Sequence, residues 1–182
     1  MKKKYKAMVL SCMDPRFQTK VSNYLKRRKL TGKYSAFTIA GAAVGVTAPK
    51  FKKWHSTFWE NLNTSIKIHK INKLIVINHM DCGAAKIVNG VKEFNLQNEM
   101  KIHENSFEKI KSYLRRKHPR LKLELNLMSL NGKIEKCNPG NFFIKTLKID
   151  RNTGPNHQYS DLEAEKLVYK LLTLVLDDRI SF

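Results

Sequence analysis

Short apolar runs alternate with longer amphipathic segments along this chain, and each run is bounded by polar or turn-forming residues. Runs of this length, closed at both ends, are typical of buried strands in a parallel sheet. The predicted strands are residues 7–11, 34–39 and 73–78. Two further apolar stretches, residues 121–130 and 133 onward, flank Asn131-Gly132. That dipeptide predicts a β-hairpin closed by a type I′ turn.

The segments between the strands carry apolar residues at helical spacing. Residues 15–29 begin at Pro15, which is favoured at the first helical position. Residues 99–117 end before Pro119, because the residue preceding a proline resists the helical region. A last helix is predicted from a capping box at Ser160. The remaining predicted helix spans residues 54–69, with apolar positions at Phe58, Leu62, Ile66 and Ile68.

Strands that alternate with helices imply right-handed crossovers and a mostly parallel sheet. We therefore predict an α/β fold with a mostly parallel sheet flanked by helices, to which the hairpin adds an antiparallel edge strand. The length of 182 residues and the 42% hydrophobic content fit a single domain over residues 1–182. No apolar stretch approaches the ~20 residues of a membrane helix, and the run after Met1-Lys2-Lys3-Lys4 is too short for a signal peptide. We expect a cytoplasmic protein without membrane contact.

Chemically distinctive residues follow two of the predicted strands. Cys12, Asp14 and Arg16 come directly after the first strand, and His79 and Cys82 come directly after the third. Ligands of open α/β sheets bind at the carboxyl ends of the strands, so these side chains are expected to converge. Two thiolates and one imidazole are typical of a catalytic zinc site, because three protein ligands leave a fourth position open.

The two segments resemble the signature of the β-class carbonic anhydrases, which is Cys-x-Asp-x-Arg followed later by His-x-x-Cys-Gly. The resemblance implies a three-layer fold, in which helices flank four parallel strands and one antiparallel edge strand. It implies one Zn²⁺ per chain, held by Cys12, His79 and Cys82. It also implies reversible hydration of CO2 to bicarbonate by a zinc-bound hydroxide, which an Asp14–Arg16 pair orients. Members of the family are homodimers or higher homo-oligomers. In some of them the aspartate corresponding to Asp14 can instead bind zinc and close the site.

Asp14 also has a simpler interpretation, because an aspartate before Pro15 is a good N-cap for the following helix. Arg16 is harder to explain in this way, since a cation in the first turn opposes the helix dipole. Asp81 is interpreted as another helix cap and is given no catalytic role. Cys137 is the third of 3 cysteines and is expected to be a thiol without function. An odd count argues against a disulfide framework and for a reducing compartment.

Residues 40–46 are small and are expected to form a loop that lines the substrate pocket, with contributions from Ala40, Gly41 and Gly83. Thr38-Ile39 stands before Ala40-Gly41, where the family commonly has Arg-Asn. This departure leaves a second enzymatic hypothesis open, in which the same zinc site hydrolyses COS or CS2.

The net charge of +20 supports an alternative from another class, a zinc-stabilised fold that binds polyanions such as nucleic acid. Basic residues cluster in residues 26–29 and 115–120, near the ends of predicted helices. Cations are favourable at helix C-termini, so a solvated surface is the preferred interpretation of both clusters. Nucleic-acid binding is therefore not favoured.

Overall fold

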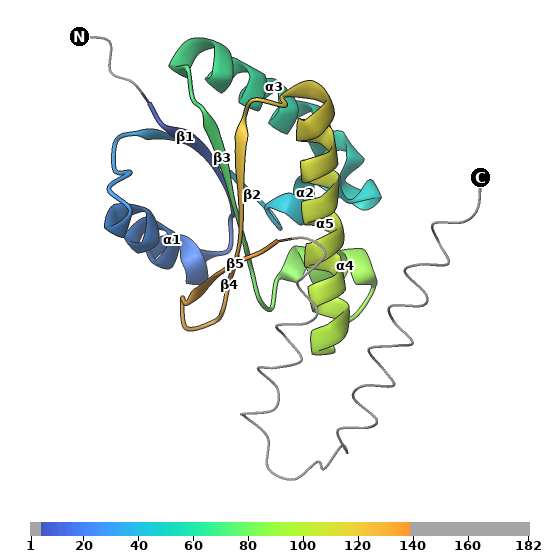
Figure 1. The fold of residues 1–182 in the computed structure, drawn as a ribbon. Coiled ribbons are helices and arrows are strands. Elements are labelled where there is room, and N and C mark those ends of the chain that lie inside the picture. The colour runs from blue at the N-terminus through green and yellow to red at the C-terminus, as the bar shows by residue number, and fades with distance from the viewer. Residues whose placement is uncertain (1–4, 139–182) are drawn as a thin grey trace, which may run out of the picture. The chain divides into compact units, whose positions relative to one another are not determined.

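A five-stranded sheet forms the centre of the computed structural model, which describes residues 5–138 (Figure 1). The strand order is β2-β1-β3-β4-β5. The first four strands are parallel, and β5 pairs antiparallel with β4 at the edge. The predicted sheet of four parallel strands and one antiparallel edge strand is confirmed. Its members are β1 (Ala7–Cys12), β2 (Tyr34–Ile39), β3 (Lys73–His79), β4 (Lys122–Met128) and β5 (Ile134–Lys136).

Helices occupy the segments between the strands, and their bounds lie close to the predicted ones. They are α1 (Pro15–Arg27), α2 (Ala43–Thr47), α3 (Lys52–His69), α4 (Gly83–Asn89) and α5 (Leu96–Lys117), with a 3-10 turn at Pro49–Phe51. The loop predicted over residues 40–46 is wrong in its second half, because α2 begins at Ala43. A helix of 5 residues is too short to show helical periodicity in the sequence.

The sheet is covered on both faces, so the structure has three layers. Alternate residues of each strand point to opposite faces. Ala7 and Val9 of β1 belong to a cluster with Phe17 and Leu25 of α1. Met8 and its alternate neighbours belong to a larger cluster with residues of α2, α3 and α5. Figure 1 accordingly shows α1 alone on one side of the sheet and the other helices on the opposite side.

The β4–β5 connection is a hairpin, but the type I′ turn predicted for it is wrong. A type I′ turn needs positive φ at both central residues. In the Asn131-Gly132 pair only Gly132 has one, at +87°. Ser129 N donates to the Lys133 carbonyl at 2.9 Å, and Gly132 N donates to the Ser129 carbonyl at 2.9 Å. This is a three-residue loop with glycine in the left-handed position.

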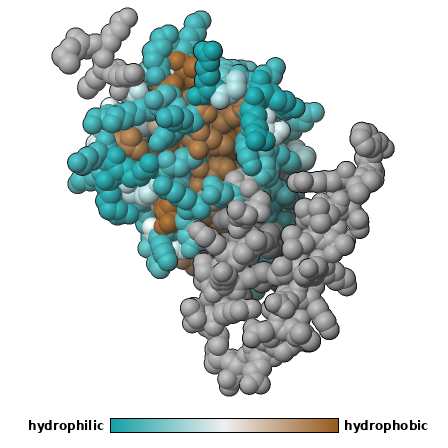
Figure 2. Space-filling model, in the orientation of Figure 1, coloured by the Kyte–Doolittle hydropathy of each residue, from teal (hydrophilic) through white to brown (hydrophobic). Residues whose placement is uncertain are grey.

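Within residues 5–138, no helix is both long enough and apolar enough to cross a bilayer. Figure 2 shows a surface on which hydrophilic side chains surround a hydrophobic strip. The helix predicted from Ser160, and the part of the predicted single domain after residue 138, lie outside the described residues.

Candidate metal centre

Cys12, His79 and Cys82 meet at the carboxyl ends of β1 and β3. One ligand atom from each residue lies within 4.8 Å of the others. All three residues are buried, with at most 6% of their surface exposed. The convergence expected from the two sequence motifs is therefore present, and this group could hold a metal ion.

Strand pairing explains why these residues meet. β1 and β3 are parallel neighbours, with Ser11 of β1 beside Ile77 of β3. The residues that follow these two positions therefore reach the same edge of the sheet. Cys82 occupies the N-cap position of α4, which begins at Gly83.

The His79 ring has one nitrogen engaged and one without a partner. Nδ1 lies 2.8 Å from the Met80 carbonyl oxygen and therefore carries the proton that it donates. Nε2 is buried and has no hydrogen-bond partner. The ring also stacks on Phe17, with a centroid distance of 4.0 Å. A histidine held by its other nitrogen, with an unpartnered basic nitrogen in a buried site, is arranged as metal ligands are.

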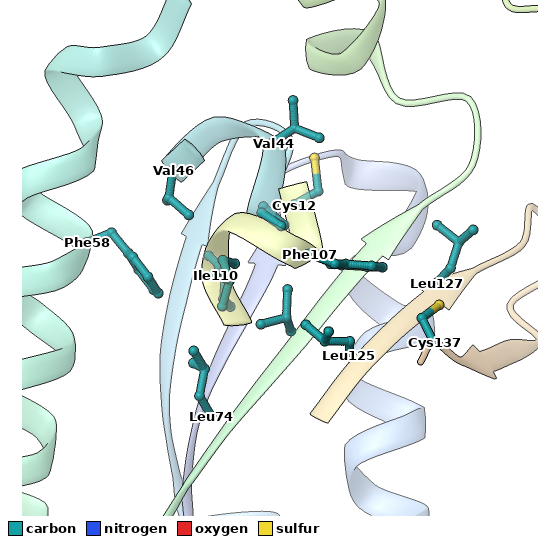
Figure 3. Close-up of a cluster of buried hydrophobic side chains, with 14 of the residues drawn as sticks. Cys12, Val44, Val46, Phe58, Leu74, Phe107, Ile110, Leu125, Leu127 and Cys137 are labelled. Carbon is teal, nitrogen blue, oxygen red and sulfur yellow. The ribbon is translucent and has the colours of Figure 1, made fainter. Parts of the chain in front are cut away.

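The Cys12 sulfur accepts a hydrogen bond from the Gly41 amide at 3.2 Å. Gly41 has a φ of +77°, and a Cβ at this position would lie 2.8 Å from the Ala84 Cβ. Only glycine fits this backbone conformation and close approach. Figure 3 shows Cys12 beside Val44 in the buried apolar cluster, so the thiol lies where the core ends.

The two thiols of the group affect each other strongly. A hydrogen bond from the Cys82 thiol lowers the pKa of Cys12. The Cys12 sulfur, together with burial, raises the pKa of Cys82. Two thiolates at this separation repel each other, and a bound dication would remove that conflict. Soft sulfur ligands with one imidazole suit zinc, so the donor set fits the group that the sequence motifs imply.

Asp14 lies beside this group and is held by Arg16. The Arg16 Nη2 donates to Asp14 Oδ2 at 2.7 Å, and Nε donates to Oδ1 at 3.0 Å. These hydrogen bonds hold the pKa of Asp14 below its usual value. Asp14 Oδ2 lies 3.9 Å from His79 Nε2. Asp14 is also the N-cap of α1, since its Oδ1 accepts from the Arg16 backbone amide at 3.0 Å, so both interpretations of this residue hold.

Asp81 is a second partner of Arg16 that the sequence did not indicate. Its Oδ2 accepts from Arg16 Nη1 at 2.7 Å, and its backbone carbonyl accepts from Nη2 at 2.9 Å. The Lys86 ammonium forms an ion pair with the same carboxylate. The prediction that Asp81 caps a helix is wrong, because Cys82 is the N-cap of α4 and Asp81 has a φ of +56°.

A buried polar network behind Cys82 was also missed. The Glu99 Oε1 accepts from the Cys82 backbone amide at 3.2 Å and lies 3.6 Å from His103 Nε2. The amide of Asn78 contacts His103 Nδ1 at 2.9 Å through Nδ2 and accepts from the Ala43 amide at 3.0 Å through Oδ1. This network joins the end of β3 to α2 and α5. The 3.6-residue repeat places Glu99 and His103 on one face of α5, but it cannot show that this face is buried.

Two of the three predicted pocket residues, Gly41 and Gly83, lie beside the metal group. Gly41 contacts Cys12, and Gly83 opens α4 at a position where an added Cβ would meet no atom within 4 Å. A cavity of about 460 Å³ lies next to the site and shares Asp81 and Glu99 with it. Its lining includes none of Ala40, Gly41 and Gly83. The assignment of Ala40, Gly41 and Gly83 to a substrate pocket stays a prediction.

The chain is similar in sequence to known proteins. Residues 1–116 match the family described as "Putative carbonic anhydrase". An uncharacterised protein of Rickettsia conorii is 26% identical over 129 residues, which cover 70% of this chain and 69% of that protein.

Two solved structures show the same fold. The tetrameric β-carbonic anhydrases of Sordaria macrospora include a chain that superposes with a TM-score of 0.51 at 9% identity, over 75% of this chain and 82% of that one. The β-carbonic anhydrase CafA of Aspergillus fumigatus gives 0.51 at 9% identity, over 81% and 83%. The resemblance inferred from the two motifs is confirmed.

Proposed function

Because the chain belongs to the family described as "Putative carbonic anhydrase", we propose that it is a zinc enzyme that converts CO2 and water to bicarbonate and back. The observation that carries this proposal is the buried group of Cys12, His79 and Cys82 beside the Asp14 carboxylate. One Zn²⁺ per chain would be held by these three ligands. When bound, zinc supplies a Lewis acid that makes water a nucleophile near neutral pH.

Asp14 and Arg16 supply the remaining chemistry. The guanidinium contacts both oxygens of Asp14, so the carboxylate is ionised and fixed in orientation. An ionised carboxylate only accepts hydrogen bonds. Asp14 would therefore accept a hydrogen bond from the attacking hydroxyl group and direct its lone pair toward the carbon of CO2. Arg16 acts through Asp14 and is a positioning residue.

We further propose that the protein is a homodimer or higher homo-oligomer in the cytoplasm. The tetrameric state of the Sordaria macrospora enzymes supports the first part. The free thiols of Cys12, Cys82 and Cys137 support a reducing compartment. Light scattering coupled to gel filtration measures the oligomeric state directly, and a monomer at micromolar concentration would contradict the proposal.

Stopped-flow CO2 hydration on protein of known zinc content tests the activity. Asp14→Asn and Arg16→Ala should each keep zinc but lower kcat by roughly 10²-fold or more, because the hydroxyl group loses its acceptor. Arg27→Ala is the matched control, since this exposed arginine lies on the same helix away from the metal group. Near-normal rates in both site variants would refute the proposed role of the pair. A zinc-loaded wild-type protein that turns over COS or CS2 but not CO2 would reassign the substrate.

A further inference from the structure

A second site lies on the opposite side of the sheet from the large helical layer, in an open groove between α1 and the β4–β5 hairpin. Its volume is about 440 Å³. Among the described residues, its lining consists of three cations, two carboxamides and one glycine, namely Lys20, Arg27, Lys133, Asn23, Asn131 and Gly132. None of these six residues carries a carboxylate.

The helix and the hairpin bring these cations together by different means. Lys20, Asn23 and Arg27 follow the i, i+3, i+7 spacing of one helical face, and α1 contains no acidic residue. The hairpin loop lies against the aliphatic stem of Lys20, since a Cβ on Gly132 would lie 3.2 Å from the Lys20 Cδ. This contact places Lys133, the next residue, beside the helical cations.

The other two arginines of this region have acidic partners, and the groove cations do not. Arg16 is paired with aspartates, and Arg28 is paired with Glu124. Within residues 5–138, no ion pair is formed by Lys20, Arg27 or Lys133. The Lys20 Nζ lies 5.0 Å from the centroid of the Phe17 ring, a contact that does not neutralise its charge. Three like charges on residues that line one groove repel one another, and an anion bound among them would reduce that repulsion.

The carboxamide of Asn131 is fixed in an orientation that leaves its donor end available. Its Oδ1 accepts from the Ser129 hydroxyl at 2.6 Å and from the Lys133 amide at 3.0 Å. Both hydrogen bonds use the oxygen, so the NH2 group is the end that can donate to a ligand. Lysine, arginine and amide donors around one groove are the groups that bind phosphate oxygens.

We propose that this groove binds the phosphate groups of a small anionic ligand, with a diphosphate as the matching charge. The site is separate from the metal group, and it does not depend on the proposed hydratase activity. Nucleic acid is the competing partner, because its backbone offers the same phosphate chemistry, but the convergence of the cations on one groove favours a small ligand.

Calorimetric titration of the zinc-loaded full chain with pyrophosphate tests the proposal, with zinc content measured after the titration. The triple variant Lys20→Gln, Arg27→Gln, Lys133→Gln should bind pyrophosphate roughly tenfold more weakly or worse. The matched control is Lys52→Gln, Lys53→Gln, Lys67→Gln, which removes the same charge from exposed positions of α3. The control should change the affinity by less than about twofold.

Several outcomes would overturn the proposal. These are no pyrophosphate binding by the wild type, an equal loss in both triple variants, or binding of a single-stranded RNA through the groove without any binding of pyrophosphate. Lys133→Gln alone, in the exposed hairpin loop, guards against misfolding of the triple variant and should show a smaller loss in the same direction. CO2 hydration should be unchanged in the groove variants, because none of these residues belongs to the metal group or to the Asp14–Arg16 pair.

Discussion

Arg16 donates two hydrogen bonds to Asp81, a residue 65 positions away, through Nη1 to the carboxylate at 2.7 Å and Nη2 to the backbone carbonyl at 2.9 Å. The same guanidinium holds Asp14. Arg16 therefore links the segment after β1, which carries Asp14, to the segment after β3, which carries Asp81. A guanidinium held at both ends has little freedom to release Asp14, which favours the arrangement in which Asp14 is kept away from the metal.

Asp81→Asn should reduce turnover without loss of metal. The amide keeps the shape and tolerates the left-handed backbone at this position, but it removes the charge that holds Arg16. We expect kcat for CO2 hydration to fall roughly three- to tenfold, with one zinc per chain retained. Lys86→Gln is the control, because it removes the other partner of Asp81 and leaves Arg16 untouched. Wild-type kcat in Asp81→Asn would show that Asp14 alone is enough to fix Arg16.

Cys82→Ser should lose the metal. The hydroxyl of serine is a much poorer zinc ligand than a thiolate, and Cys82 is one of the three convergent donors. Metal analysis of the purified variant should give far less than one zinc per chain. Cys137→Ala should keep its zinc, because Cys137 is a buried thiol outside the group. Full zinc content in Cys82→Ser would remove this residue from the ligand set.

Gly41→Ala should destabilise the protein and weaken metal binding together. The added methyl group would lie 2.8 Å from the Ala84 Cβ, and the backbone has a φ of +77°. Strain of this kind costs about 1–3 kcal/mol, and relief of it would move the amide that donates to Cys12. Thermal unfolding and competition with a chelator measure the two effects.

Gly83→Ala is the matched control for this substitution. Nothing lies within 4 Å of the added methyl group, and the residue starts α4. Alanine favours helix over glycine by up to about 1 kcal/mol, so stability should stay equal or rise. Equal destabilisation by the two substitutions would contradict the role assigned to Gly41.

Glu124→Gln should destabilise the fold near neutral pH but not in acid. Burial raises the pKa of Glu124. The hydrogen bond and charge of Arg28, with a contribution from Lys73, lower this pKa by a larger amount, so it lies below its usual value. Tyr24 also contacts this carboxylate at 3.2 Å. A carboxyl group with a depressed folded pKa stabilises the fold above its unfolded pKa of about 4.3, and this contribution is lost as pH falls through the folded value.

Urea unfolding at a series of pH values measures this effect. The free energy of unfolding of Glu124→Gln should lie about 1–2 kcal/mol below that of the wild type at pH 7, and the difference should shrink below about pH 4. Glu108→Gln removes an exposed ion pair with Lys111 and should change stability little at any pH. A difference between Glu124→Gln and the wild type that stays constant into acid would contradict the assignment.

The sheet and the convergence of Cys12, His79 and Cys82 could be predicted from the sequence, because the signals for both are local. Buried parallel strands are continuous apolar runs, so the ends of β1 and β3 could be located, and the candidate ligands lie at those ends or just after them. Two predictions were wrong, namely the turn type at Gly132 and the loop over residues 40–46, whose second half is helix α2. Both features depend on backbone angles over a few residues, which the spacing of apolar residues does not indicate.

The supporting residues could not be predicted because their partners are distant in sequence. Glu99 and His103 are polar residues of α5 that pack against the back of the metal group. Polar residues on a helix are ordinarily exposed, and only the tertiary arrangement makes these two buried. Asp81 was given a local role as a cap, whereas its partner Arg16 comes from another strand end.

The order of the strands also has a kinetic consequence. Cys12 is the last residue of β1, His79 is the last residue of β3 and Cys82 lies just after it, and the whole of β2 and α3 separates β1 from β3 along the chain. The three candidate ligands therefore come together only when β3 pairs with β1. Contacts between such distant segments form slowly during folding. Zinc uptake by a refolding chain should therefore report the pairing of β3 with β1. A probe of zinc binding during refolding should detect no bound zinc before this pairing.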